Sequence, residues 1–342
     1  MNEWTEFWKE HNKDIEAPFF PGMADVSAAE KWTKDDEAGA ISSIDFENLE
    51  ITPRIVLVDD WCRAGDLGFI FASRGLGKTW LAMHLAHGLA TKSNIGPWIV
   101  HESLKVLYVD GEMSAADIQF RDRVLGSPTE SLFYLNHEIL FERTGRIMNL
   151  ADLSFQAGMV TYCEKMKYQA VFLDNLSTLA SGVDENKAID WEIIQPWLLN
   201  LRRSGITVVF IHHAGRNNEL RGSSKREDPA SWILRLDAPN NSDEMPGAHF
   251  ISRFTKWRGA QCQPKSYEWH YRPGSSNHIT VDVMETNPIS VFRQHIENGL
   301  DTCTLIAEEM GVTPGYISQL ATKAENAGWL EKKGRKYVLL SD

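Results

Sequence analysis

The chain has 342 residues, of which 43% are hydrophobic and 24% are charged, and its formal net charge is −12. This composition is typical of a globular protein, so it excludes a wholly disordered or collagen-like chain, and the length fits one large domain or two to three smaller ones. No apolar run approaches the ~18 residues needed to cross a membrane, so we expect no membrane association.

The four cysteines lie far apart and form no CxxC pair. A zinc ribbon is therefore not expected, and free thiols fit a reducing cytosol. The first residues are acidic and aromatic rather than basic and then apolar, so the sequence shows no secretory signal. We expect a cytoplasmic protein.

Residues 1–50 carry 13 acidic and 4 basic side chains among isolated aromatic residues. Trp4, Phe7 and Trp8 have the i, i+3, i+4 spacing of a short amphipathic helix. We interpret this segment as an acidic N-terminal arm, which packs either on its own core or on a neighbouring subunit.

Residues 51–287 alternate between apolar segments typical of strands and segments typical of helices. The expected strands are Gly68–Ala72, Val106–Asp110, Ala170–Asp174, Thr207–His212, Phe250–Lys256 and Ser266–Tyr271. The expected helices are Trp80–Thr91, Ala115–Arg123, Leu153–Met166 and Ala188–Arg203. Continuous apolar strands that alternate with helices predict an α/β core, in which a mostly parallel sheet is covered on both faces.

Residues 288–342 form a separate region with a different pattern. The expected elements are the helices Pro288–Asn298, Thr304–Met310 and Gly315–Ala327, then a strand from Leu330 and a returning strand Tyr337–Leu340. Thr313 and Pro314 are typical of the start of a helix, as an N-cap followed by a first-turn proline. This order of elements looks like a winged helix.

The expected wing of this region is basic. It contains Lys332, Lys333, Arg335 and Lys336, which suit DNA phosphates. Polar residues on the third helix suit a major groove; they are Ser318, Gln319, Thr322 and Lys323. We expect this region to bind duplex DNA, with a protein interface as the alternative.

A glycine-bearing loop joins the first expected strand to its helix, in the sequence Ala72-Ser-Arg-Gly75-Leu-Gly77-Lys78-Thr79-Trp. The two glycines allow backbone N–H groups to converge on an anion, Lys78 reaches the terminal phosphates of a nucleotide, and Thr79 can bind Mg²⁺. The strict pattern begins with glycine, and Ala72 occupies that position here. We predict a binding site for ATP and Mg²⁺ that consists of Ser73, Arg74, Gly75, Leu76, Gly77, Lys78, Thr79 and Trp80.

Carboxylates end two of the other expected strands. Asp174 would lie at the carboxyl edge of the sheet beside the loop, where it suits a ligand of Mg²⁺ or of its water. Glu112 lies just beyond the strand that follows the loop helix, so it is our candidate for the base that orients the attacking water. Asp110, at the end of that same strand, is the alternative.

His212 and His213 end the next strand. Because neighbouring strand residues point to opposite faces, one histidine is expected to sense the γ-phosphate. The following segment surrounds Gly-Ser-Ser with the basic residues Arg216, Arg221, Lys225 and Arg226. These groups suit single-stranded DNA phosphates, although a solvated loop is the alternative.

These motifs together resemble the RepA-like family of hexameric replicative DNA helicases, within the RecA-like P-loop ATPases. The resemblance covers roughly residues 55–272 and rests on the P-loop, Asp-Gly-Glu112-Met, Phe-Leu-Asp174-Asn, the histidine pair, Leu-Arg221-Gly-Ser-Ser and Phe-Thr-Lys256. It implies a hexameric ring with ATP between subunits. It also implies that Lys78, Thr79, Glu112, Asp174 and His213 act on ATP, and that the segment Arg216–Arg226 faces the central channel.

One position departs from that family. An arginine just before the tryptophan of the helix that follows the basic segment acts across the subunit interface there, and the matching residue here is Ser231. Lys256-Trp-Arg258-Gly instead resembles the finger motif of DnaB-type replicative helicases. We predict that Arg258 is the arginine finger, which acts on the ATP of a neighbouring subunit, with Lys256 beside it. The alternative is that both residues belong to a β-hairpin and are simply solvated.

We therefore expect an ATP-hydrolysing helicase or translocase of a plasmid, phage or mobile element that moves on single-stranded DNA. The alternative is a DNA-binding ATPase that does not unwind DNA and acts as a regulator, a loader or an accessory of transposition or replication.

Overall fold

The structure is a computed structural model, and it describes residues 40–180, 188–213, 227–239, 246–260, 263–274, 278–286, 288–310 and 312–340. Most of the predicted acidic arm, with Trp4, Phe7 and Trp8, lies outside these residues. The predicted single-stranded DNA contacts also lie outside them; they are Arg216, Arg221, Lys225 and Arg226. Within the described ranges, no helix has both the length and the apolarity that a bilayer crossing requires.

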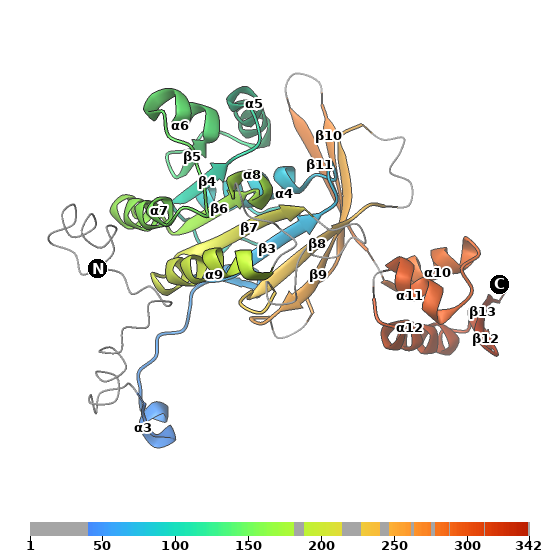
Figure 1. Ribbon diagram of the computed structural model, residues 1–342. Helices are drawn as coiled ribbons and strands as arrows, with labels where there is room; N and C mark the ends of the chain where they lie inside the picture. The colour runs from blue at the N-terminus through green and yellow to red at the C-terminus, as the bar shows by residue number, and fades with distance from the viewer. Residues whose placement is uncertain are drawn as a thin grey trace.

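In the described part of the chain, nine strands form one sheet in the order β11-β10-β9-β8-β3-β7-β6-β4-β5 (Figure 1). Neighbouring strands from β8 to β5 are parallel, and β9, β10 and β11 continue the sheet in antiparallel fashion. The strands are β3 (Leu67–Ala72), β4 (Val106–Asp110), β5 (Leu132–Asn136), β6 (Ala170–Asp174), β7 (Thr207–His213), β8 (Trp232–Asp237), β9 (Ala248–Trp257), β10 (Tyr267–Pro273) and β11 (Ile279–Glu285). The predicted α/β core with a mostly parallel sheet is confirmed.

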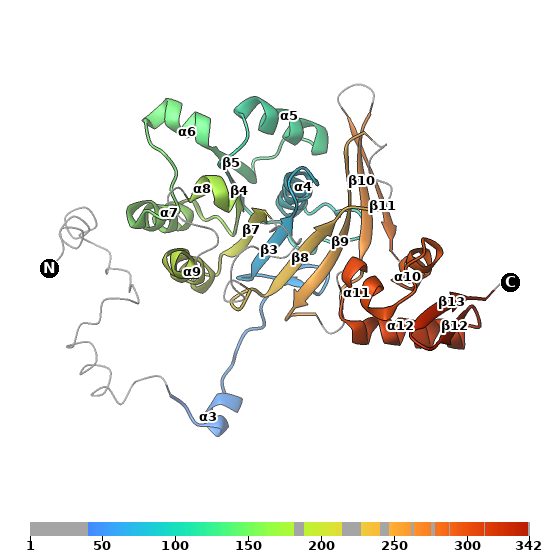
Figure 2. The same ribbon diagram turned by 45° about the vertical axis from the view of Figure 1, so that its right-hand side comes forward.

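Helices cover both faces of this sheet (Figures 1 and 2). One face packs against α4 (Lys78–Thr91) and α5 (Ala115–Leu125), and the other packs against α7 (Leu153–Met166), α8 (Leu176–Leu179) and α9 (Ala188–Arg203). Side chains of each strand alternate between the two cores, so that Ile70 contributes to the first and Phe69 to the second. Burial on both faces explains the continuous apolar strand sequences.

Trp232 begins strand β8, which the sequence pattern did not predict. The strand runs parallel to β3, with Gly68 paired to Trp232, and its first residues are fully buried. A side chain at Gly68 would lie 2.0 Å from the Trp232 ring, so glycine makes room for this close packing. Tertiary packing therefore decides the conformation of this segment.

Several further elements were not predicted. They include β1 (Val56–Val58), β2 (Cys62–Arg63), β5, α6 (His137–Thr144), α8 and β11. The pair β1–β2 forms a small separate sheet, whereas β5 and β11 lie at the two edges of the main sheet. Edge strands are covered less completely, so their apolar pattern is weaker.

The C-terminal region contains α10 (Pro288–Glu297), α11 (Cys303–Met310), α12 (Pro314–Asn326), β12 (Leu330–Lys333) and β13 (Lys336–Leu339). Thr313 caps α12 by accepting a hydrogen bond from the Tyr316 N–H, as its sequence predicts. These elements enclose a small hydrophobic core of their own. Arg253 of β9 joins the region to the sheet, because its Nη1 donates to the carbonyl of Met310 at 2.8 Å.

The helix α3 (Ser43–Glu47) buries none of its residues, and it stands away from the rest of the chain in both views (Figures 1 and 2). Ile44 is 72% exposed and Phe46 is 56% exposed. Apolar side chains on an unpacked helix indicate a segment that another surface would cover.

Candidate active site

The loop between β3 and α4 has the backbone geometry of an anion cradle. Gly75 and Gly77 have positive φ angles of 78° and 103°, and Gly77 is the N-cap of α4. A side chain at Gly77 would also lie 2.9 Å from Phe250 of β9. Glycine is therefore required here by conformation and by packing, and the N-terminus of α4 is open to a phosphate.

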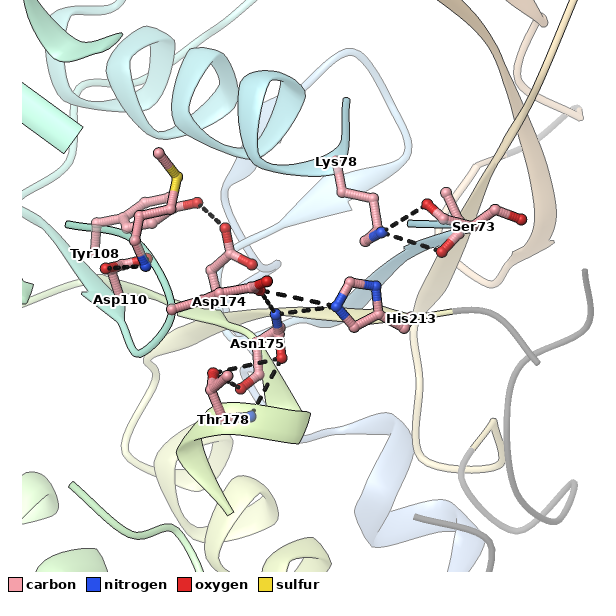
Figure 3. Close-up of polar contacts among 11 residues, drawn as sticks. Ser73, Lys78, Tyr108, Asp110, Asp174, Asn175, Thr178 and His213 are labelled. Carbon is pink, nitrogen blue, oxygen red and sulfur yellow. Dashed lines mark hydrogen bonds and ion pairs between the residues drawn. The ribbon is translucent and has the colours of Figure 1, made fainter. Parts of the chain in front are cut away.

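The Lys78 side chain is buried under this loop. Its Nζ donates to the carbonyls of Ala72 at 3.1 Å and Ser73 at 2.9 Å (Figure 3). Burial lowers the pKa of Lys78 to about 8, although Asp174 and Glu112 act in the opposite direction. The ammonium group is thus held in place before a nucleotide binds, and phosphate oxygens would stabilise its charged form.

Asp174 ends β6 beside the loop, and its carboxylate is buried. It accepts a hydrogen bond from the Tyr108 hydroxyl at 2.7 Å (Figure 3) and another from Thr79. Burial raises the pKa of Asp174, and these two hydrogen bonds partly offset the rise. Thr79 and Asp174 thus bring together the oxygen ligands that Mg²⁺ prefers, so the residues fit the ion.

Asp110 and Glu112 have different surroundings. Asp110 is buried and accepts hydrogen bonds from Asn136 Nδ2 at 2.8 Å and from the Met113 N–H at 3.2 Å. Burial, reinforced by the charge of Asp174, raises the pKa of Asp110 to about 7. The side chain of Glu112 is 50% exposed and reaches toward His213 of β7. The exposure of Glu112 favours it as the group that orients the attacking water. The hydrogen bonds of Asp110 indicate a structural role in the turn after β4.

His213 is directly beside the phosphate loop. It pairs with Ala72, the last residue of β3, and its Nε2 lies 3.8 Å from a carboxylate oxygen of Glu112. The neighbouring His212 is fully buried and pairs with Phe71. Of the two histidines, His213 is the one that the structure brings to Glu112.

Lys256 and Arg258 lie near the end of the strands that is opposite to the phosphate loop. Arg258 directly follows Trp257, which pairs with Trp232, and Trp232 pairs with Gly68 near the start of β3. The phosphate loop begins at the other end of β3, roughly 13 Å away at ~3.3 Å per residue. Neither side chain can therefore reach a nucleotide in the loop of its own subunit.

Backbone carbonyls hold both of these basic side chains. The exposed Arg258 donates to the carbonyl of Asp228 at 2.8 Å, and Lys256 donates to the carbonyls of Glu227 and Asp228. Ser231 is buried, and its carbonyl accepts from the Arg258 N–H. The guanidinium group of Arg258 is thus presented at the surface, beside Ser231.

A protein-family model described as an AAA domain matches residues 35–219, just over half of the chain. The chain belongs to this AAA domain family. The match includes the P-loop, Glu112, Asp174 and His213, and it ends before Arg258. The AAA domain thus accounts for the nucleotide-binding edge of the sheet, and this chain carries a P-loop ATPase domain.

Two solved structures are similar to this AAA domain protein. A KaiC-like protein from Pyrococcus horikoshii has 16% identity and a TM-score of 0.46, over 64% of this chain and 90% of that chain. The flagellar accessory protein FlaH from Methanocaldococcus jannaschii has 13% identity and a TM-score of 0.43, over 65% and 91%. No protein with a curated description matches the chain.

Sequence reasoning missed three polar residues at this AAA site. Tyr108 binds Asp174, Asn136 binds Asp110, and Asn175 binds Glu112. Tyr108 and Asp110 are two apart on β4, so strand alternation could have placed both on one face. Asn136 and Asn175 each follow a run of apolar residues at the end of a strand, which is the same signal that identified Asp174.

The contrast between the two carboxylates leads to a prediction. Glu112→Gln should lower the rate of ATP hydrolysis by about a hundredfold while ATP still binds, because only the group that accepts the water proton changes. Asp110→Asn should lower the rate by less than about tenfold. Steady-state turnover and equilibrium nucleotide binding would measure both effects, and a reversed ranking would assign the base to Asp110.

Proposed function

We propose that this protein is an ATP-hydrolysing helicase or translocase that moves on single-stranded DNA and is encoded by a plasmid, phage or mobile element. The observation that carries the proposal is the position of His213. Its imidazole lies 3.8 Å from Glu112, and the chain continues directly into the segment with the predicted single-stranded DNA contacts. Contact of DNA with Arg216 would thus act three residues along the chain from His213.

In the proposed reaction, a water molecule attacks the γ-phosphorus in line with the bond to the leaving oxygen. Glu112 accepts the water proton, that bond breaks, and ADP and phosphate result. Lys78 stabilises negative charge on the β- and γ-phosphates. Mg²⁺, held by Thr79 and Asp174, would neutralise further charge on the same oxygens.

The proposed active form is a homo-oligomer, with a hexameric ring as the expected assembly. The phosphate loop and Arg258 lie at opposite ends of the strands of one sheet, so a head-to-tail contact would bring the Arg258 of one subunit to the ATP of the next. Such a heterologous contact closes into a ring when the rotation permits. The exposed apolar side chains of α3 support a further contact between subunits.

We also propose that the C-terminal region is a winged helix that binds duplex DNA, with a protein as the alternative partner. The polar face of α12 is exposed, including Ser318, Gln319, Thr322 and Lys323. In the hairpin, Lys333 pairs with Glu331 at 3.2 Å and Lys336 pairs with Asp301 at 2.6 Å. Among the described residues, no carboxylate forms an ion pair with Lys332 or Arg335, so these two are the better phosphate contacts.

A paired comparison tests this difference. The double substitution Lys332→Ala with Arg335→Ala should weaken duplex binding and reduce the dependence of log affinity on log salt by about 0.9 for each lost contact. Lys333→Ala with Lys336→Ala is the matched control, and it should have a smaller effect because carboxylates already neutralise both lysines. Unchanged affinity in both variants, measured across a salt series, would favour a protein partner.

The main proposal is tested by the rate of ATP hydrolysis with and without single-stranded DNA, together with the mass of the protein in the presence of a non-hydrolysable nucleotide. We expect stimulation by DNA and an oligomer. A strand-displacement assay separates the two candidate functions, because a regulator or loader would hydrolyse ATP without unwinding. If the rate of ATP hydrolysis is the same with and without single-stranded DNA, the proposed motor function is wrong.

A further inference from the structure

Asn175 lies between the two groups that we assign to the reaction. It follows Asp174 directly, is fully buried, and is the N-cap of α8. Its Nδ2 donates to a carboxylate oxygen of Glu112 and lies 3.3 Å from His213 Nε2 (Figure 3). The carboxyl ends of three strands, β4, β6 and β7, thus bring Glu112, Asn175 and His213 into a single polar cluster.

The other end of the Asn175 amide fixes its orientation. Oδ1 accepts a hydrogen bond from the Thr178 N–H at 3.4 Å, which caps α8. Because the oxygen is used by the cap, the NH₂ group must point toward Glu112 and His213. The assignment of nitrogen and oxygen therefore follows from the hydrogen-bond network.

The cap alone does not require asparagine. Serine, threonine or aspartate could accept the same hydrogen bond at the start of a helix. Only asparagine adds two N–H donors, one for the carboxylate of Glu112 and one aimed at His213. An aspartate would instead place another carboxylate beside Glu112. The two N–H donors of the amide thus explain why residue 175 is asparagine.

Glu112 needs a partner of this kind. Its side chain is 50% exposed, and it extends from the turn that follows β4 rather than from a strand or helix. A long, half-exposed side chain samples several rotamers, and a water-activating carboxylate must keep one geometry. A buried amide on a helix cap is a rigid anchor for it.

We propose that Asn175 is a positioning residue, which holds the Glu112 carboxylate in the orientation for attack by water and links it to His213. This inference rests on the proposed ATP hydrolysis. Asn175 itself does not contact the reacting atoms, so it should affect turnover through Glu112 and leave nucleotide binding unchanged.

Two substitutions separate this role from capping. Asn175→Ser keeps a capping oxygen and removes the donors, and it should lower turnover by about tenfold with little change in ADP affinity or melting temperature. Asn175→Asp keeps both shape and cap but repels Glu112, so it should lower turnover further. Asn136→Ser is the matched control, because Asn136 is also a buried N-cap that donates to a carboxylate, here Asp110. It should change turnover by less than about threefold.

A double substitution gives the decisive measurement. If Asn175 acts through Glu112, Asn175→Ser should cost no further activity in the Glu112→Gln background. An equal loss in both backgrounds, or near-normal turnover in Asn175→Asp, would overturn the proposal. Wild-type protein that hydrolyses ATP without any effect of DNA would overturn only the proposed motor, because these comparisons need hydrolysis alone. Wild-type protein without ATP hydrolysis would overturn both.

Discussion

Replacing Lys78 with alanine should lower ATP hydrolysis by about a thousandfold and weaken nucleotide binding. Lys78 is the only buried cation of the phosphate loop, and its ammonium group is already held by the carbonyls of Ala72 and Ser73. Without it, charge that develops on the β- and γ-phosphates has no fixed counterion from the protein. Turnover at saturating ATP and equilibrium binding of ADP would measure the two effects.

Arg74→Ala is the control for this prediction. Arg74 is the other cation of the loop, and its side chain is exposed, so it should contribute much less than Lys78. Because Lys78 is buried and hydrogen-bonded, the melting temperature of each variant must also be measured to separate unfolding from loss of chemistry. Near-normal turnover in folded Lys78→Ala would contradict the assignment of the site.

The nucleotide-binding edge of the sheet could be predicted from the sequence because of a local rule. Three of the central strands are continuous apolar runs that end in a polar residue, namely Asp110, Asp174 and His213. The carboxyl ends of parallel strands lie on the same side of a sheet. The sequence therefore predicts that these three polar residues lie close together. The choice between Asp110 and Glu112 is not determined by the sequence pattern, because it depends on the hydrogen bond from Asn136 to Asp110 and on the burial of Asp110.

The position of Arg258 could not be predicted in this way. It follows from the antiparallel direction of β9, and that direction depends on β8, a strand that the sequence pattern did not predict. The segment Trp232–Asp237 is apolar enough for either conformation, and the contact of Trp232 with Gly68 decides between them. The role of Asn175 could not be predicted either, because its two partners, Glu112 and His213, are 63 and 38 residues away in the sequence.

Arg258→Ala should lower ATP hydrolysis by about a thousandfold at the subunit interface, with nucleotide affinity close to that of the wild type. The loop of each subunit covers one side of the triphosphate, and the γ-phosphate at the sheet edge stays open to a neighbour. A guanidinium group from that neighbour would stabilise charge on the equatorial oxygens, whereas Ser231 cannot. Arg272→Ala, which removes another exposed arginine, is the control and should have little effect.

Mixing two inactive variants tests whether Arg258 acts between subunits. An Arg258→Ala subunit keeps its own Lys78, Glu112 and Asp174, and a Lys78→Ala subunit keeps its Arg258. In a random equal mixture, about one interface in four joins an intact phosphate loop to an intact arginine, so activity should partly return. No recovery in mixed rings of confirmed mass would show that Arg258 does not complete the site of its neighbour. Because the sheet separates Arg258 from the loop of its own subunit, such a result would remove Arg258 from the reaction altogether.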